Sequence, residues 1–410
     1  MIQSVDLTSQ DYFRNPAAAV ERLRAAGPVL EIRFPIVGKV WITTTQDLAA
    51  RVLKGSRTFT LRKDGGAIAG MRWWMPGVIR AIADNMLTMD EPDHTRLRSI
   101  VDEAFRRRAI LAMEPRILAL AGALADDLFT EGMPADLVDR FARRLPLAVI
   151  CELLGLPDAD RPKFIAWTNR FTRLTNAAGF LGLIPAMMSM RRYLEHRLDV
   201  TRQEGGDGLI AELVRVEKDG GRISRREMVA MVFLLLGAGT ETTTHLISGS
   251  VYELLRVPDL RDWLAQDWSR ANLAVEEFLR FVSPVQFSKP RYVRTDVELD
   301  GVRVPKGDRI MAMLAAANMD PHANSHPEKL DLTRQPNRHL AFGTGIHFCL
   351  GHQLARIEGK CALEALLTRW PKLELAASDQ QIRWRERPGI RALASLPVRP
   401  GDPSAAPAGR

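Results

Sequence analysis

The chain has 410 residues, of which 46% are hydrophobic and 26% charged, as expected for a globular protein with a sizeable buried core. Its net charge of +8 is spread along the sequence, and no DNA- or RNA-binding motif accompanies it. This distribution argues against nucleic acid as a partner and favours an acidic protein. Three cysteines are too few for a disulfide framework and indicate a reducing cytoplasm.

The N-terminus lacks the charged and apolar regions of a signal peptide. No segment consists of the roughly 20 apolar residues that a membrane span needs, so we predict a soluble protein without membrane association. No linker, repeat or low-complexity run divides residues 1–400, which we predict to form a single domain. The Pro-, Gly- and Ala-rich residues 401–410 predict a frayed tail.

Helical patterns dominate the sequence, and strand signals are few and short. Two apolar runs, at residues 29–33 and 40–44, predict a hairpin near the start. A second hairpin is predicted at residues 297–304, around Asp300-Gly301, a dipeptide suited to a tight turn. Residues 310–314 add one more strand. These signals predict a mainly α protein with a small β region.

One long helix is predicted for residues 224–256. Ser224 and Glu227 form a capping box at its start, and Val257-Pro258 ends it. At ~1.5 Å per residue, this helix would extend roughly 48 Å and cross the molecule. Its middle, residues 237–244, combines glycines with threonines, which are weak helix formers and can bend the axis. Such a local conflict inside a long buried helix indicates a functional site.

Residues 342–351 form the most informative segment, because they place Cys349 among three glycines. A helix predicted for residues 350–370 puts the sulfur near a helix N-terminus, where free N–H groups and the helix dipole favour a thiolate. A thiolate there can bind a metal, and the glycines let a large flat ligand approach the backbone. The alternatives are a buried free thiol and a zinc site, whose ligands would be His347, Cys349, His352 and Cys361 at spacings unlike those of common zinc modules.

The pattern Phe-Gly-x-Gly-x-His-x-Cys-x-Gly resembles the haem-ligand loop of the cytochrome P-450 family. It is matched here at Phe342, Gly343, Gly345, His347, Cys349 and Gly351. The resemblance implies the cytochrome P-450 fold, with the long central helix over the haem. It also implies that Cys349 is the axial ligand of the iron in haem b, and that the other residues of the loop line the cofactor.

Residues 238–242 resemble the oxygen-activation motif of the same family. In that motif Ala238 and Gly239 make room beside the haem. Splitting dioxygen requires two protons to enter a dry site, and the resemblance implies that Glu241 and Thr242 deliver them. The alternative is a helix-bending threonine next to a surface glutamate.

Glu277 and Arg280 are spaced i, i+3 and share one helix face. The resemblance implies that they join Arg334 in a buried network that supports haem insertion, which is a structural role. It further implies that the two haem propionates meet basic side chains. The candidates for this contact are His94, Arg98, Arg291 and His347.

The substrate side is less clear in the sequence. Residues 70–76 and 180–190 are rich in methionine and aromatic groups, which suit an adaptable apolar pocket. For each pocket candidate, ordinary core or lid packing is the alternative. The candidates are Trp73, Trp74, Leu235, Val285, Phe287 and Ile390.

The resemblance implies a monooxygenase that inserts one atom of dioxygen into an apolar small organic molecule and reduces the other atom to water. The electrons would come from a ferredoxin or flavodoxin with its reductase, attracted by basic residues such as those at 106–108. We expect a cytoplasmic monomer. Two alternatives stay open, namely a peroxide-driven hydroxylase and a non-catalytic haem-binding sensor or carrier.

Overall fold

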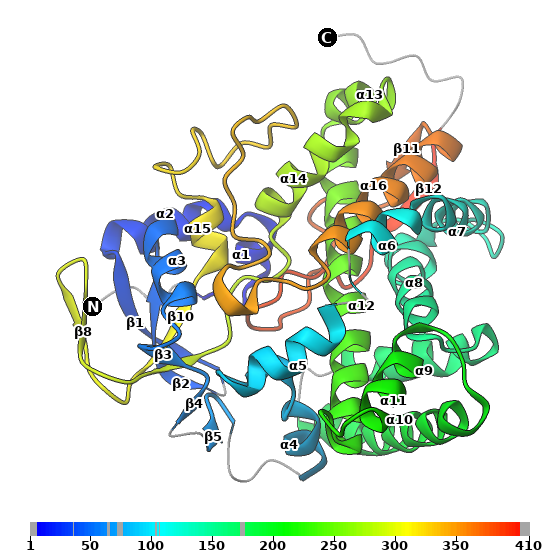
Figure 1. Ribbon diagram of the computed structural model, residues 1–410. Coiled ribbons are helices and arrows are strands. Elements are labelled where there is room, and N and C mark those ends of the chain that lie inside the picture. Colours follow the sequence, from blue (N-terminus) through cyan, green and yellow to red (C-terminus); the bar gives the residue numbers. More distant parts are fainter. Residues whose placement is uncertain are drawn as a thin grey trace.

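The computed structural model describes residues 6–35, 37–63, 66–71, 77–102, 105, 107–172 and 177–401. In these residues a large helical body lies beside a smaller sheet region (Figure 1). The prediction of a mainly α protein with a small β region is therefore confirmed. One hydrophobic cluster contains residues from Tyr12 to Val398 and so joins both ends of the chain. The single domain at residues 1–400 stays a prediction, and residues 402–410 of the expected tail lie outside the described part.

Sixteen α-helices are present in the described residues. They are α1 (Gln10–Arg14), α2 (Pro16–Ala26), α3 (Gln46–Lys54), α4 (Gly77–Ala83), α5 (Asp93–Asp102), α6 (Arg107–Ala112), α7 (Glu114–Asp126), α8 (Arg144–Leu154), α9 (Arg161–Thr172), α10 (Ala177–Glu204), α11 (Gly208–Lys218), α12 (Arg225–Arg256), α13 (Pro258–Ala265), α14 (Ala271–Val282), α15 (Leu314–Asn318) and α16 (His352–Arg369).

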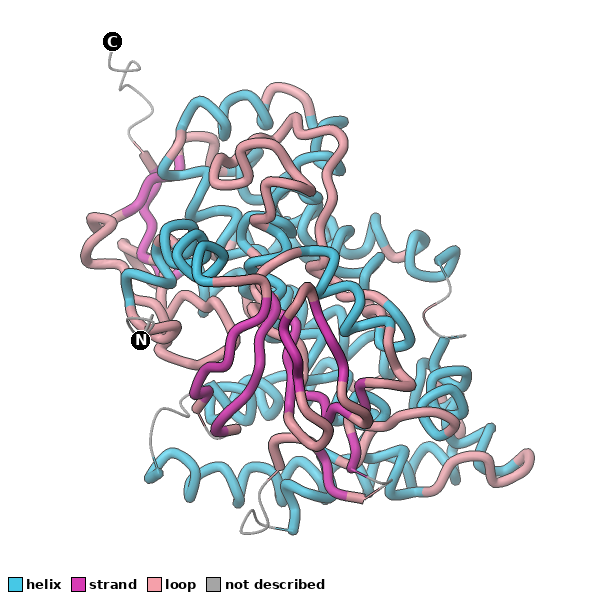
Figure 2. Tube along the Cα trace, turned by 90° about the vertical axis from the view of Figure 1, so that its left-hand side faces the viewer, coloured by secondary structure: helices cyan, strands magenta, loops and turns pink. Residues whose placement is uncertain are grey.

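The strands of the described residues are short. They are β1 (Val29–Phe34), β2 (Gly38–Thr43), β3 (Phe59–Thr60), β4 (Arg62–Lys63), β5 (Ala67–Ile68), β6 (Ala135–Asp136), β7 (Arg291–Val293), β8 (Val297–Leu299), β9 (Val302–Val304), β10 (Arg309–Ala312), β11 (Leu373–Leu375) and β12 (Pro397–Pro400). The largest sheet has the strand order β1-β2-β10-β7-β3, and Figure 2 shows its strands side by side.

Both predicted hairpins are present. β1 and β2 pair antiparallel, with Val29 opposite Thr43. β8 and β9 pair antiparallel across Asp300-Gly301, whose φ angles of 45° and 78° are both positive, as a type I′ turn requires. The expected strand near residue 310 is β10, which lies parallel to β2 and joins the first hairpin to β7. The sheet therefore brings the early hairpin against the segment that follows α14.

The long predicted helix is α12, which crosses the helical body (Figure 1). The Ser224 hydroxyl accepts from the Glu227 N–H, and the Glu227 carboxylate accepts from the Ser224 N–H, so the capping box is formed. α12 packs against α8, α14 and α16. By length and composition α12 also qualifies as a membrane span, but 61% of its most apolar window is buried inside the fold. Packing against neighbouring helices accounts for its apolar sequence.

Candidate functional site

The ligand loop, which we define as residues 342–351, connects the sheet region to the N-terminus of α16. The Cys349 N–H donates to the Phe342 carbonyl over 3.0 Å and closes the loop on itself. Gly345 has a φ of +76°, and a Cβ there would lie 2.7 Å from the Leu53 carbonyl oxygen at the end of α3. Only glycine lets the loop approach α3 so closely. The backbone therefore fixes the position of the sulfur.

The aromatic ring of Phe342 lies close to two residues of α16, Arg356 and His352. The Arg356 guanidinium stands 4.6 Å from the centre of the Phe342 ring, and the His352 ring is 6.0 Å away. Glu276 on α14 accepts from Arg356 over 2.5 and 2.9 Å, which fixes the guanidinium in place. α14 and α16 thereby hold the loop through Glu276 and Arg356.

Burial raises the pKa of the Cys349 thiol, although the Gly351 N–H and the charges of Arg98 and Arg356 lower it. The predicted N–H donor at the start of α16 is present and favours the thiolate, but burial of the sulfur opposes it. Desolvation outweighs the N–H donor and the nearby cations. A bound metal supplies the missing charge, because metal binding displaces the thiol proton.

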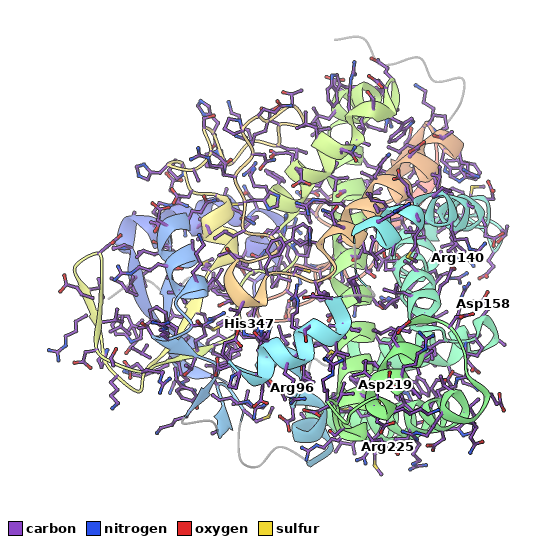
Figure 3. All side chains as sticks on the ribbon, viewed as in Figure 1. Arg96, Arg140, Asp158, Asp219, Arg225 and His347 are labelled. Carbon is purple, nitrogen blue, oxygen red and sulfur yellow. The ribbon has the colours of Figure 1, made fainter. Side chains whose placement is uncertain are left out.

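Basic side chains converge beside the ligand loop. His94 on α5 is 2% exposed, and its ring lies 4.4 Å from that of His347 in an edge-to-face contact. Figure 3 shows His347 on the ligand loop just above α5. Burial lowers the pKa of His94, that of His347 to about 3 and that of Arg291 to about 10.

Each of these three residues has a buried nitrogen without a hydrogen-bond partner among the described residues. The nitrogens are His94 Nδ1, His347 Nε2 and Arg291 Nε. Buried donors of this kind need an acceptor, and three basic groups in one place call for anionic oxygens. Arg98 differs, since its Nε donates to Asp102 over 2.8 Å and its Nη1 donates to the Phe348 carbonyl over 2.8 Å. Arg98 thus holds the ligand loop.

Room is left beside glycines of the ligand loop and of the middle of α12, and we call this room the open space. A Cβ added at Gly237, Gly343 or Gly351 would meet no atom within 4 Å. Gly237 and Ala238 are exposed although they belong to a helix whose following turns are almost entirely buried. This space has an apolar edge at α12, a thiol at the loop and unpartnered bases at one side. These features fit a flat apolar ligand with two carboxylates, such as haem.

Two threonines at the centre of α12 bond back to carbonyl groups of their own helix. The Thr242 hydroxyl donates to the Ala238 carbonyl over 2.8 Å, and Thr244 makes the same bond to Thr240 over 2.7 Å. The Glu241 carboxylate forms an ion pair with Arg387, which lies in the loop before β12. Glu241 is therefore tied to the loop before β12, and Thr242 follows it directly in the chain.

Glu277, Arg280 and Arg334 meet in one buried network. Glu277 and Arg280 are both 0% exposed, and the guanidinium of Arg280 donates to the Glu277 carboxylate over 2.7 and 2.8 Å. Arg334 donates to Glu277 over 3.1 Å, and the Asn337 amide donates over 3.0 Å. The network links α14 to residues 325–337, so it fixes the segment that precedes the ligand loop.

The structure places the pocket candidates in different surroundings. Val285 and Ile390 are bridged backbone to backbone, so these two lie together. Phe287 is buried and packs edge-to-face on Phe34, with ring centres 5.2 Å apart. Leu235 is buried in a core cluster with residues of α8 and α11. Trp73 and Trp74 lie outside the described residues.

Two residues near this space, Arg387 and Lys289, were missed by the sequence reasoning. Arg387 is 146 residues from its partner Glu241, and no local pattern links them. Lys289 stands two residues from both Phe287 and Arg291, so alternation along an extended segment could have placed it on their face. The sequence analysis named Phe287 and Arg291 as candidates but not Lys289 between them.

The zinc alternative receives no support from the geometry. In the parts of the chain that the structure describes, no group of three or more His, Cys, Asp or Glu residues is arranged to hold a metal. The Cys361 sulfur lies 3.8 Å from the Glu114 carbonyl, in the contact between α16 and α7. Cys361 is thus buried between two helices, whereas Cys349 is only partly buried on the ligand loop.

Comparisons with known proteins agree with this site. Residues 187–391 match the family model described as Cytochrome P450. The vitamin D(3) 25-hydroxylase of Pseudonocardia autotrophica is 40% identical over 98% of this chain and 97% of its own length. The solved structure of the polyketide synthase cytochrome P450 PksS of Bacillus subtilis has a TM-score of 0.88 and 35% identity, and covers 97% of this chain and 100% of that one. The structure of the myxobacterial cytochrome P450 CYP267B1 with myristic acid has a TM-score of 0.87 and 38% identity, over 96% and 98% of the two chains.

The fold, the cysteine loop and these similarities define a haem-thiolate enzyme. The chain belongs to the cytochrome P450 family. Its relatives are named as hydroxylases and monooxygenases, so it is a monooxygenase that oxidises small organic molecules with dioxygen and electrons. A non-catalytic haem sensor or carrier is disfavoured, because these relatives are enzymes.

Proposed function

We propose that this monooxygenase holds haem b, with Cys349 as the axial ligand and with His94, Arg291 and His347 at the propionates. The observation that supports this assignment is the set of three buried basic groups that lack partners among the described residues. Two carboxylates would supply acceptors for all of them and would compensate the charge of Arg291. Arg98 would hold the loop while its remaining nitrogen faces the same side.

When bound, the haem supplies the activation of dioxygen for insertion of one oxygen atom into the substrate. The role of the protein's own residues is to shape the site around that chemistry. Ala238 and Gly239 would keep the α12 side free of bulk, and Phe342, under the Arg356 guanidinium, would shield the sulfur. The Cys349 N–H is used by the Phe342 carbonyl, which leaves the Gly351 N–H to steady the charge on sulfur.

We infer that Glu241 and Thr242 move protons into the site. The Thr242 hydroxyl donates to Ala238 and keeps its oxygen lone pairs free to accept from a water. Glu241 is partly exposed and paired with Arg387, so opening this ion pair would let the carboxylate turn from solvent toward Thr242. A relay of this kind delivers protons while the rest of the site stays dry.

For the substrate we propose a largely apolar small molecule. Val285 and Ile390 are apolar, and their backbones are bridged, so they would act together at the substrate. The relatives also support an apolar substrate, since one is named for vitamin D(3) and the structure of another contains myristic acid. An apolar body of this kind would be held mainly by the removal of apolar surface from water.

The electron donor is proposed to be an acidic ferredoxin or flavodoxin, with its reductase, in the cytoplasm. The ligand loop reaches the surface at Phe348, which is 37% exposed. Exposed basic residues lie on helices that pack against α16, namely Arg108 on α6 and Arg116 on α7, the latter paired with Glu152. A basic surface near the sulfur would orient an acidic protein toward the shortest path for electrons. Arg106, part of the same basic run, lies outside the described residues.

The test is the reduced protein with carbon monoxide. Haem-loaded protein should show the strongly red-shifted band that marks an anionic sulfur opposite carbon monoxide, and Cys349→Ser should lose it. Arg291→Met should lower the haem bound per polypeptide, whereas Arg294→Met, three residues further along and exposed, should not. Normal haem content in Arg291→Met would contradict the propionate assignment.

A further inference from the structure

The loop before β12 folds back on itself over residues 384–393, which we call the 384–393 hairpin. Trp384 and Leu393 are bridged antiparallel, and the Arg385 N–H donates to the Ala392 carbonyl over 2.8 Å. Because hydrogen bonds join its two arms, a displacement of the base of this hairpin moves its tip as well.

Two residues at the tip of the hairpin contact segments of the proposed site. Arg387 forms the ion pair with Glu241 of α12, and Ile390 is bridged to Val285. The place at which Arg387 holds the Glu241 carboxylate is therefore set outside α12. It depends on how the 384–393 hairpin is anchored to the rest of the fold.

A glutamine at the start of α1 anchors the base of the hairpin. The Gln10 amide oxygen accepts from the Trp384 N–H over 2.8 Å, and the amide nitrogen donates to the Trp384 carbonyl over 2.8 Å. The same nitrogen donates to the Glu386 carboxylate over 3.0 Å. Trp384 and Leu393 face each other as a non-hydrogen-bonded pair, so the backbone groups of Trp384 point away from the hairpin. The Gln10 side chain thus takes the position of a third strand.

This two-point contact needs a side chain that both accepts and donates. An amide does so with two fixed atoms, whereas a carboxylate only accepts and a thioether is a weak acceptor. Trp384 is 3% exposed, so loss of the contact would leave a buried backbone N–H and carbonyl without these partners. Gln10 is therefore suited to this contact by its chemistry as well as by its position.

The other arm of the hairpin is also held by α1. The Arg391 guanidinium donates to the Phe13 carbonyl over 2.7 Å and to the Arg14 carbonyl over 3.3 Å. It also donates to the Glu253 carboxylate of α12 over 3.4 Å. α1 thus contacts both arms, and Arg391 fixes this assembly against the helix that carries Glu241.

We propose that Gln10 is a positioning residue for the reaction and that it acts through Arg387 on the Glu241 carboxylate. This inference rests on the proposed proton relay and deepens it. With its base held, the hairpin keeps Arg387 in place, so Glu241 starts from a defined position. Without the anchor the tip shifts, and a misplacement of about 1 Å is enough to slow a transfer up to about 100-fold.

The proposed defect changes how dioxygen is reduced when no organic substrate is present. Two electrons and two protons convert dioxygen to hydrogen peroxide, whereas four electrons and four protons convert it to two molecules of water. The second outcome requires protons at the outer oxygen before peroxide leaves. A displaced relay should therefore raise the ratio of peroxide to water.

The first measurement follows the hairpin itself and needs no turnover. Hydrogen exchange of haem-loaded protein is read by mass spectrometry in peptides that cover residues 383–394. Gln10→Met keeps the length of the side chain but removes the two-point contact, so these amides should exchange about 10-fold faster or more. Gln10→Glu, which sets a carboxylate against the Trp384 carbonyl and Glu386, should have the same effect.

The second measurement follows the electrons. Haem-loaded protein receives NADPH, a plant-type ferredoxin and its reductase, without organic substrate, and hydrogen peroxide is compared with NADPH oxidised. The ratio of peroxide to water should rise about threefold or more in Gln10→Met and in Arg387→Met. The double variant should stay within about 1.5-fold of Arg387→Met, because Gln10 acts through Arg387 and the two effects are not additive.

Asn324→Leu is the matched control, because the Asn324 amide makes the same two-point contact elsewhere. It accepts from the Arg338 N–H over 3.0 Å and donates to the Arg338 carbonyl over 2.6 Å. This variant loses an equivalent pair of hydrogen bonds, but it should leave the exchange of residues 383–394 and the peroxide ratio within about 1.5-fold of the unchanged protein. The carbon monoxide band is recorded on every sample, so each ratio refers to protein with an intact haem site.

Three results would overturn the proposal. The first is unchanged hydrogen exchange at residues 383–394 in both Gln10 variants. The second is a peroxide ratio in Gln10→Met that equals that of the unchanged protein or of Asn324→Leu. The third is a double variant whose effect is the product of the two single effects, which would separate Gln10 from Arg387. Thr242→Ala, measured in parallel, tests the relay: if only Thr242→Ala raises the ratio, the relay stands and the anchor is wrong, and if Thr242→Ala leaves it unchanged, the relay itself is wrong.

Discussion

Glu277→Gln is the sharpest test of what holds the ligand loop in place. The carboxylate of Glu277 is fully buried and accepts from two guanidinium groups, those of Arg280 and Arg334. An amide of the same size keeps the packing but removes the negative charge. Two buried cations would then lack a counter-charge, which is the situation in which a buried ion pair becomes strongly destabilising.

The expected cost follows from that geometry. Removing one partner of a buried pair costs roughly 3–5 kcal/mol. The entropy of unfolding is about 2.1 cal/mol/K per residue, so a chain of this length has roughly 0.9 kcal/mol/K. The midpoint of thermal unfolding should fall by about 3–6 °C. Because residues 325–337 lead into the ligand loop, the variant should also bind less haem per polypeptide.

Glu212→Gln is the matched control, because Glu212 and Arg215 form a pair of the same i, i+3 spacing on α11. That pair has a nitrogen-to-oxygen distance of 2.6 Å, but its two side chains are 44% and 57% exposed. An exposed pair contributes about 0.2–1 kcal/mol, so this midpoint should move by about 1 °C or less. Thermal unfolding is followed by circular dichroism at one heating rate, and haem content by absorbance. Equal midpoints for the two variants would refute the reasoning.

Two other residues of α12 give testable outcomes. Thr242→Ala should keep the fold, release more hydrogen peroxide and form at least roughly tenfold less product per electron pair. Thr244→Ala, which loses the same kind of back-bond, should change neither quantity. Equal peroxide release by the two variants would refute the relay. Burial and nearby arginines lower the pKa of His245 to about 3, so only the unfolded chain gains its proton below pH 6.5. The free energy of unfolding should therefore fall by about 1.4 kcal/mol per pH unit from pH 6.5 toward pH 3 because of this residue. His245→Asn should remove that contribution when unfolding is measured as a function of pH. An unchanged slope in the variant would contradict the buried neutral state of His245.

The sequence was sufficient for the elements whose signals are local. The capping box at Ser224 is made by residues three apart, and both partners are present in the structure as predicted. The turn at Asp300-Gly301 requires positive φ at both residues, which this dipeptide tolerates. The ligand loop is also local, because its glycines and Cys349 lie within ten residues. These features follow from short-range sterics and hydrogen bonding, which a sequence pattern records directly.

The rest of the site depends on contacts between distant segments. The pairing of Glu241 with Arg387 is set by how the loop before β12 packs over α12, and no spacing in the sequence encodes it. The same is true of Phe287, whose ring is used for packing on Phe34 in addition to any contact with substrate. The state of Cys349 could not be predicted either, because the balance between burial and N–H donation depends on the depth of the sulfur in the fold.

The exposure of residues inside the fold is the observation that a sequence cannot supply. Gly237 and Ala238 are exposed although the turns of α12 that follow them are buried. This exposure depends on which segments pack beside the middle of α12, and the residues of α12 alone do not record it.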